Sequence, residues 1–196
     1  IQIFDLDGNF IKKFGETGDE QGKFISPFDI ISHKNELFVL DTGNQRIQVF
    51  DNDGIFLREF SIINADRLGS FLSYTLNLEK MDISIYEDEL FIMNSSESSV
   101  KKFTLDGKLI DTIYMSEIKP KSITSVSVAD NLLLVTDSEM NKIFIFTLNG
   151  EQILSFGNFG NLYGEFSSPQ DVLFDGKKIF VSDAYNYRIQ IFELIP

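Results

Sequence analysis

Short apolar stretches, separated by polar turns, run through most of this chain. Between residues 24 and 60 there are four of them, at Pro27–Ile31, Leu37–Leu40, Ile47–Phe50 and Ile55–Phe60. The turn between the last two reads Asp-Asn-Asp-Gly, a hairpin signal in which glycine readily adopts a positive φ. Four short strands joined by turns predict one four-stranded antiparallel sheet of the kind that forms a propeller blade.

The third stretch recurs along the chain. Ile-Gln-Val-Phe at 47–50 returns as Ile-Gln-Ile-Phe at 1–4 and at 189–192, with weaker copies at 100–103 and 143–146. A period of about 45 residues with several strands in each period is typical of propellers and solenoids. We therefore expect an all-β fold, a β-propeller of four-stranded antiparallel blades, incomplete and with about four blades' worth of chain.

The repeats predict a single propeller segment over 1–196. Its units are expected at about 1–23 (partial), 24–75, 76–119, 120–165 and 166–196 (partial). The chain opens on a third strand and closes just after another one. We expect a fragment of a larger ring, and the alternative is that the two ends combine to close a ring of four blades.

A glycine-rich linker joins the units. Phe-Gly-x-x-Gly-x-x-x-Gly-x-Phe occurs at 14–24 and again at 156–166, and Ser-Pro follows each copy at 26–27 and 168–169. Glycines at fixed offsets indicate turns with positive φ and a close approach to a neighbouring element. No helix pattern or Lys-Ser/Thr pair follows, so a phosphate-binding loop is disfavoured.

Together these features resemble the NHL repeat. The resemblance rests on Ser-Pro, on Asp-Thr-Gly-Asn-Gln-Arg-Ile-Gln-Val-Phe at 41–50 and on Asp-Ala-Tyr-Asn-Tyr-Arg-Ile-Gln-Ile-Phe at 183–192. The units at 76–113 and 120–156 depart from the motif. The resemblance implies a propeller of the six-bladed type and a scaffold that binds a protein or a small ligand.

Charge narrows the range of partners. Lys plus Arg number 17 against 30 Asp plus Glu, a formal net charge of −13. Such a surface disfavours nucleic acid, whose binding needs basic patches, and suits cationic ligands or basic partner surfaces. No apolar run is long enough for a membrane span. The chain has no cysteine, which leaves its compartment unknown.

One candidate binding surface is the loop face of the propeller. We expect it to hold the linker between units, the turn between the second and third strands, and the irregular segment 61–75, because loops on a regular scaffold tend to carry binding. Exposed tyrosine is also a favoured contact residue. The candidate ligand-binding residues are Gln45, Arg46, Asn64, Arg67, Tyr74, Phe159, Tyr163, Tyr185 and Tyr187.

The repeated Asp, Asn and Arg of the motif, such as Asp41, Asn44 and Arg46, allow a structural reading as well. A set that recurs from unit to unit is more consistent with hydrogen bonds that stabilise a turn in every unit than with a single binding site. No catalytic residue is predicted, and the expectation is a scaffold without enzymatic activity and without a cofactor.

Three carboxylates support a different function. Asp29, Asp82 and Asp171 stand at the matched position of three first strands, with Ser125 at that position in the fourth, and the three carboxylates could converge near the propeller axis. Calcium takes six to eight oxygen ligands, so the alternative is a calcium-dependent, lactonase-like hydrolase. The competing interpretation is that Asp29 pairs with Arg46 and Asp171 with Arg188 inside each blade. A structural spacer in a multidomain protein is a further alternative.

Overall fold

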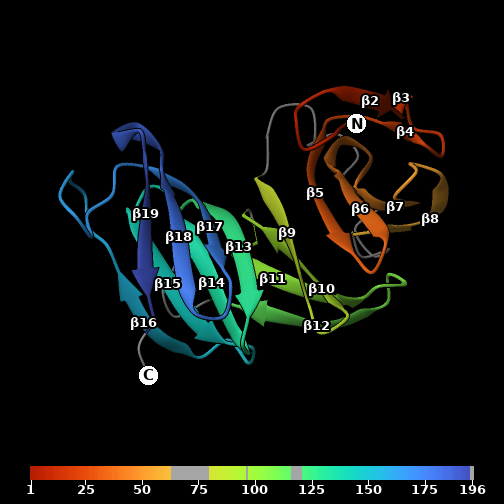
Figure 1. Ribbon diagram of the computed structural model, residues 1–196. Coiled ribbons are helices and arrows are strands. Elements are labelled where there is room, and N and C mark those ends of the chain that lie inside the picture. The colour runs from red at the N-terminus through yellow and green to blue at the C-terminus, as the bar shows by residue number, and fades with distance from the viewer. Residues whose placement is uncertain (63–79, 96, 116–120, 195–196) are drawn as a thin grey trace. The chain divides into compact units, whose positions relative to one another are not determined.

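The computed structural model describes residues 1–62, 80–95, 97–115 and 121–194, and these form two compact units, Ile1–Leu76 and Asn77–Pro196 (Figure 1). Each unit consists of strands and turns with no α-helix among the described residues. Nothing in that part of the chain is a helix long and apolar enough to span a membrane. Three candidate ligand residues, Asn64, Arg67 and Tyr74, lie outside the described residues, as does most of the segment 61–75.

The first unit holds a four-stranded antiparallel sheet in the order β5-β6-β7-β8. Its strands are β5 (Pro27–His33), β6 (Glu36–Asp41), β7 (Arg46–Asp51) and β8 (Phe56–Ser61). Before them come the hairpin of β1 (Gln2–Phe4) and β2 (Phe10–Lys13) and the short parallel pair of β3 (Glu16–Thr17) and β4 (Lys23–Phe24). The 3₁₀ turn η1 (Thr42–Asn44) joins β6 to β7.

Phenylalanine fills the core of this unit. Phe24, Val39 and Phe50 are buried, and Phe14 and Phe56 pack against them. The Phe50 ring lies 4.9 Å from that of Phe14, 5.7 Å from that of Phe24 and 5.9 Å from that of Phe56, measured between centroids. The linker phenylalanines at 14 and 24 therefore anchor the linker on its sheet by burying apolar surface.

The second unit holds two four-stranded antiparallel sheets and one of three strands. The first contains β9 (Met81–Tyr86), β10 (Glu89–Asn94), β11 (Ser99–Thr104) and β12 (Leu109–Tyr114). The second contains β13 (Ile123–Ala129), β14 (Leu132–Asp137), β15 (Lys142–Thr147) and β16 (Gln152–Phe156). The third contains β17 (Pro169–Phe174), β18 (Lys178–Asp183) and β19 (Arg188–Glu193), with the 3₁₀ turn η3 (Ala184–Asn186) before β19.

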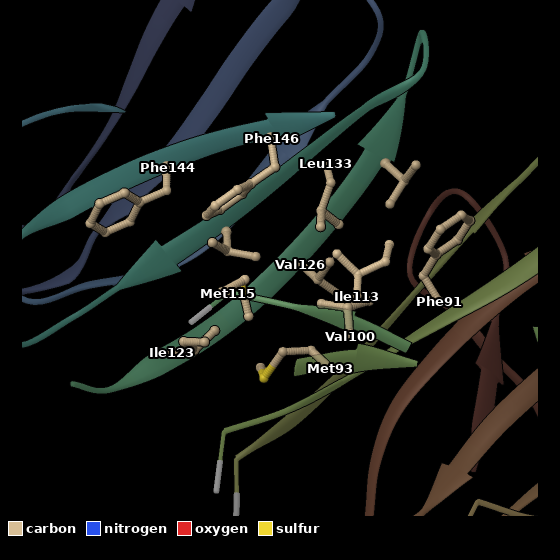
Figure 2. Close-up of a cluster of buried hydrophobic side chains, with 12 residues drawn as sticks. Phe91, Met93, Val100, Ile113, Met115, Ile123, Val126, Leu133, Phe144 and Phe146 are labelled. Carbon is tan, nitrogen blue, oxygen red and sulfur yellow. The ribbon is translucent and has the colours of Figure 1, made fainter. Parts of the chain in front are cut away.

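Apolar side chains fill the space between neighbouring sheets of this unit. Figure 2 shows Phe91, Met93 and Val100 from the β9–β12 sheet meeting Val126 and Leu133 from the next one. A second cluster joins the β13–β16 sheet to the β17–β19 sheet through Leu134, Phe166 and Val181, among others. Sheets packed face to face in this way account for the apolar repeat positions.

The predicted all-β propeller architecture of four-stranded antiparallel sheets is confirmed. The predicted strands lie at the observed places, with ends that differ by a few residues. The expected single propeller segment over 1–196 stays a prediction, as do its unit boundaries.

Candidate functional site

A buried carboxylate organises the end of the second unit. Asp183 ends β18 and its side chain is fully buried. Its Oδ1 accepts the N–H of Ser167 at 2.7 Å, and its Oδ2 accepts the Arg188 Nε at 2.8 Å and the Gln190 Nε2 at 3.0 Å. Asn186 Nδ2 donates to both oxygens. The acceptor capacity of the carboxylate is thus well used, as a buried charge requires.

These hydrogen bonds set the protonation of Asp183. Burial is the largest influence on its pKa and favours the neutral acid. The donors from Ser167, Asn186, Arg188 and Gln190 together outweigh that effect and hold the pKa below the ordinary value of an aspartate. Asp183 is therefore an anion at neutral pH, paired with the Arg188 guanidinium.

The same donors clamp the glycine-rich linker. Arg188 donates to the carbonyls of Asn161, Leu162 and Glu165 at 2.7 to 3.0 Å. Asn186 donates to the Gly160 carbonyl at 2.9 Å. These bonds fix the backbone of the linker against the end of β18 and the start of β19.

Gln190 completes the clamp. Its Nε2 donates to the Glu165 carbonyl at 2.7 Å, and its Oε1 accepts the N–H of Gly164 at 2.9 Å. Asp183, Asn186, Arg188 and Gln190 together form what we call the linker staple. The staple turns an otherwise irregular loop into a rigid surface element.

The first unit contains a second linker staple. Asp41 is fully buried and accepts from Ile25 N–H, Asn44 Nδ2, Arg46 Nε and Gln48 Nε2. The linker carbonyls of Gly18, Glu20 and Lys23 accept from these side chains, as their counterparts do in the second unit. Every staple residue is thus repeated at the equivalent position.

One candidate ligand residue, Arg46, belongs to this first staple, and a second, Gln45, lies next to it in the turn. Arg46 has about nine-tenths of its surface buried and donates to Asp41, to the Glu59 carboxylate and to two linker carbonyls. Gln45 is half-buried beside it, in a left-handed conformation with φ of 54°. Their bonds hold the turn and the linker together.

The other described candidates lie on the elements that the second staple joins. Phe159, Tyr163, Tyr185 and Tyr187 are exposed by 77%, 74%, 72% and 95%. The first two lie on the stapled linker, and the other two flank Asn186, whose side chain holds that linker at Gly160. The structure therefore brings the linker that carries Phe159 and Tyr163 next to the turn that carries Tyr185 and Tyr187.

Leu162 joins them and was not singled out from the sequence. It is 66% exposed, and Arg188 holds its carbonyl while the Glu165 carboxylate accepts its N–H. A comparison of the two linkers could have found it, because the equivalent residue of the first linker is the acidic Glu20. We call Phe159, Leu162, Tyr163, Tyr185 and Tyr187 the aromatic patch.

The first staple carries a different surface. The positions equivalent to the aromatic patch hold Thr17, Glu20, Gln21, Gly43 and Gln45. The equivalence follows from the shared hydrogen bonds and from the parallel pairing of Thr17 with Phe24 and of Phe159 with Phe166. The fold therefore does not require aromatic residues at these positions, since the same backbone is built without them.

The three candidate metal ligands serve as hydrogen-bond partners. Asp82 Oδ2 accepts the N–H of Val126 on the neighbouring sheet at 2.8 Å, and Asp171 Oδ1 accepts the hydroxyl of Ser125 at 2.6 Å. Asp29 belongs to the other unit, where its Oδ1 accepts the N–H of Ile30. In the described part of the chain, no three or more His, Cys, Asp or Glu side chains are grouped so that they could hold a metal ion.

The contacts of Asp82 are part of a repeated clasp between first strands. Ser84 accepts the N–H of Val128 at 3.1 Å, and Ser127 accepts the N–H of Phe174 at 2.9 Å. The β9–β12 sheet and the β13–β16 sheet thus each receive backbone hydrogen bonds from the first strand of the next sheet.

The competing interpretation, in which Asp29 pairs with Arg46 and Asp171 with Arg188, is wrong about the aspartates. Arg46 pairs with Asp41 and Glu59, and Arg188 pairs with Asp183. The reason is strand register. Asp41 opposes Arg46 across the β6–β7 pair, whereas Asp29 lies on β5 opposite Leu40.

Comparison with known proteins places these features in a family context. A family model described as a 6-bladed beta-propeller matches residues 115–195. The human "E3 ubiquitin-protein ligase TRIM32" is 34% identical over 147 residues, which cover 71% of this chain and 22% of that protein. The Drosophila melanogaster "Protein brain tumor" is 29% identical over 150 residues, covering 74% of this chain and 14% of that protein. The chain spans about a fifth or less of the length of these relatives, both of which carry NHL repeats.

Solved structures agree on the fold. A virginiamycin B lyase from Staphylococcus aureus matches with a TM-score of 0.62 and 14% identity, over 100% of this chain and 63% of that one. A streptogramin B lyase matches with a TM-score of 0.59 and 18% identity, over 100% and 62%. At such low identity the likeness concerns the fold alone.

Proposed function

Since this chain belongs to the NHL-type β-propellers, we propose that it is a non-enzymatic scaffold that binds a partner protein through the aromatic patch. The observation that carries the proposal is the contrast between the two linker staples. Equivalent clamps with the same glycines display aromatic side chains in the second unit and none in the first.

The comparison of the two staples indicates that the exposed aromatic residues are not needed to build the turn and the linker. Exposed aromatic side chains are unfavourable for solubility, and large apolar surface patches mark interaction sites. Here the equivalent backbone accepts Thr17 and Gln45 in place of Phe159 and Tyr187. Phe159 and Tyr187 are therefore not required by the fold of their own unit.

The patch also has the composition of a protein-binding surface. Tyrosine is enriched among the residues that dominate interface energies, because it offers a large rigid contact area and a polar tip. The staple holds its backbone in place, so little ordering entropy is lost on binding. A relative named as an E3 ubiquitin-protein ligase, an enzyme class that acts on proteins, agrees with a protein partner.

The test is a differential capture experiment with two matched variants. The patch variant carries Phe159→Thr, Tyr163→Gln, Tyr185→Ala and Tyr187→Gln, and the control variant carries Thr17→Ala, Glu20→Gln, Gln21→Ala and Gln45→Ala in the polar counterpart. We expect immobilised wild type and control to retain the same proteins from an extract of the source cells, and the patch variant to lose at least one. Identical protein sets from all three would overturn the proposal, once circular dichroism shows equal folding.

A further inference from the structure

The staple and linker that carry the aromatic patch hold two carboxylates, Asp183 and Glu165, and one arginine. We propose that the patch recognises arginine side chains on an exposed basic segment of the partner protein. The inference rests on the proposed function and adds the chemical class of the partner. It combines three observations, which concern the rings, the charges beneath them and the net charge of the chain.

The rings have faces available for a cation. Among the described residues, the cation–π contact is that of Arg58 over Phe38 at 5.6 Å, which lies in the first unit. Tyr163 touches the Phe192 ring at a centroid distance of 5.3 Å and donates its hydroxyl to the Ile191 carbonyl at 2.8 Å. Its ring is held in place while most of its surface stays exposed. A fixed, exposed ring is a suitable platform for a guanidinium group.

The charges beneath the rings leave an excess of carboxylate. Arg188 is the cation of the staple, and it is committed to Asp183 and to linker carbonyls. Glu165 adds a second carboxylate, which accepts the N–H of Leu162. One cation against two carboxylates favours a positive ligand above the patch over a negative one.

The whole chain adds a longer-range attraction. Its formal net charge of −13 draws cationic segments toward it and raises their association rate at low ionic strength. Charge alone would attract lysine and arginine equally and over the entire surface. The rings add a preference for arginine at one place, because its planar guanidinium stacks on aromatic faces and is weakly hydrated.

The probe is a fluorescein-labelled peptide with three arginines spaced by Gly-Ser, compared with the same peptide in which citrulline replaces arginine. Citrulline keeps the planar shape and removes the charge. We expect the arginine peptide to bind wild type about tenfold more tightly than the citrulline peptide. The patch variant should lose most of this difference, while the polar-counterpart control variant should keep it. A higher salt concentration should weaken the binding of the arginine peptide to wild type.

A variant that keeps apolar volume separates stacking from simple burial. Tyr185→Leu with Tyr187→Leu retains an apolar surface and removes two π faces. Loss of the arginine preference in this variant supports the inference. Equal binding of arginine and citrulline peptides to wild type overturns it, and so does an arginine preference that survives in the patch variant, which would indicate binding to the acidic surface as a whole.

A selection experiment separates this inference from the proposed function. Phage displaying random 12-residue peptides are selected on wild type and then depleted on the patch variant. Patch-dependent binders rich in arginine support the inference. Patch-dependent binders without basic residues overturn it and leave the proposed function standing. If every selected peptide binds the patch variant as well as it binds wild type, both the inference and the proposed function are contradicted.

Discussion

Tyr187 and Gln45 occupy the same position of two equivalent turns, each with φ of 54° at the C-terminal end of a 3₁₀ turn. In both turns the residue's N–H donates to the first carbonyl of the 3₁₀ turn, at 3.1 Å. A left-handed conformation is uncommon for a residue with a Cβ atom, and aromatic residues are not favoured there. The glutamine shows that the turn has no need of a ring.

Stability provides the first test of the linker staple. Asp183→Ala removes a buried carboxylate and leaves the Arg188 Nε and the Ser167 N–H without their acceptor. We expect a loss of about 3–5 kcal/mol in the free energy of unfolding, typical of breaking a buried pair from one side. Urea denaturation followed by circular dichroism measures it. Glu151→Ala on an exposed turn is the control and should change stability by no more than about 0.5 kcal/mol.

The pKa of Asp183 predicts how this contribution depends on pH. Its pKa in the folded state lies below the ordinary value, so its stabilising effect is complete above the unfolded pKa of 3.8 and is lost as the pH falls through the folded pKa. The difference in urea midpoint between wild type and Asp183→Asn should therefore shrink between pH 5 and the acid range. A difference that stays constant over this range would show that the carboxylate charge contributes nothing.

The clasp between first strands predicts a smaller effect. Ser127→Ala leaves the buried N–H of Phe174 without its acceptor, which should cost about 1–2 kcal/mol. Amide hydrogen exchange at Phe174 should become faster in the variant, because the donor is no longer protected. The control is Ser32→Ala on the exposed side of β5. If the two substitutions have equal effects, the clasp does not stabilise the unit.

Gly157 and Gly176 have similar backbone angles but different surroundings, so alanine substitutions at the two positions distinguish steric crowding from backbone strain. Gly157 has φ of 99°, and an added Cβ would lie 2.5 Å from the Phe166 ring and 2.8 Å from the Asn141 carbonyl oxygen. Gly176 has φ of 93° and open space. Both alanine variants bear the strain of a positive φ, about 1–2 kcal/mol. We expect Gly157→Ala to be clearly the less stable in thermal unfolding, and equal melting temperatures would contradict the close packing of this linker.

The sequence predicts the strands well because their signals are local. Alternating apolar residues and the turn glycines each act within a few neighbours, so β5 to β8 could be located within a few residues of their true ends. The linker was likewise readable from its glycine spacing. These features depend on backbone geometry that a single repeat unit specifies by itself.

The partners of polar side chains were harder to predict. The Asp41–Arg46 pair depends on the register of the β6–β7 hairpin. From the sequence, Asp29 on the preceding strand is the expected partner of Arg46, so the true pair is missed. The acceptors for Val126 and Phe174 come from a neighbouring sheet, so their identity depends on how sheets pack. Leu162 was missed because its exposure depends on the path of the linker and not on its residue type.

The central claim is that the aromatic patch, and not its polar counterpart, contacts a partner protein. The most direct measurement places the photo-crosslinking residue p-benzoylphenylalanine at position 187 in one protein and at position 45 in another. Both are irradiated in an extract of the source cells. The account predicts a discrete crosslinked protein from position 187 that is absent from position 45. Equal crosslinking at both positions, or none at position 187, would contradict it.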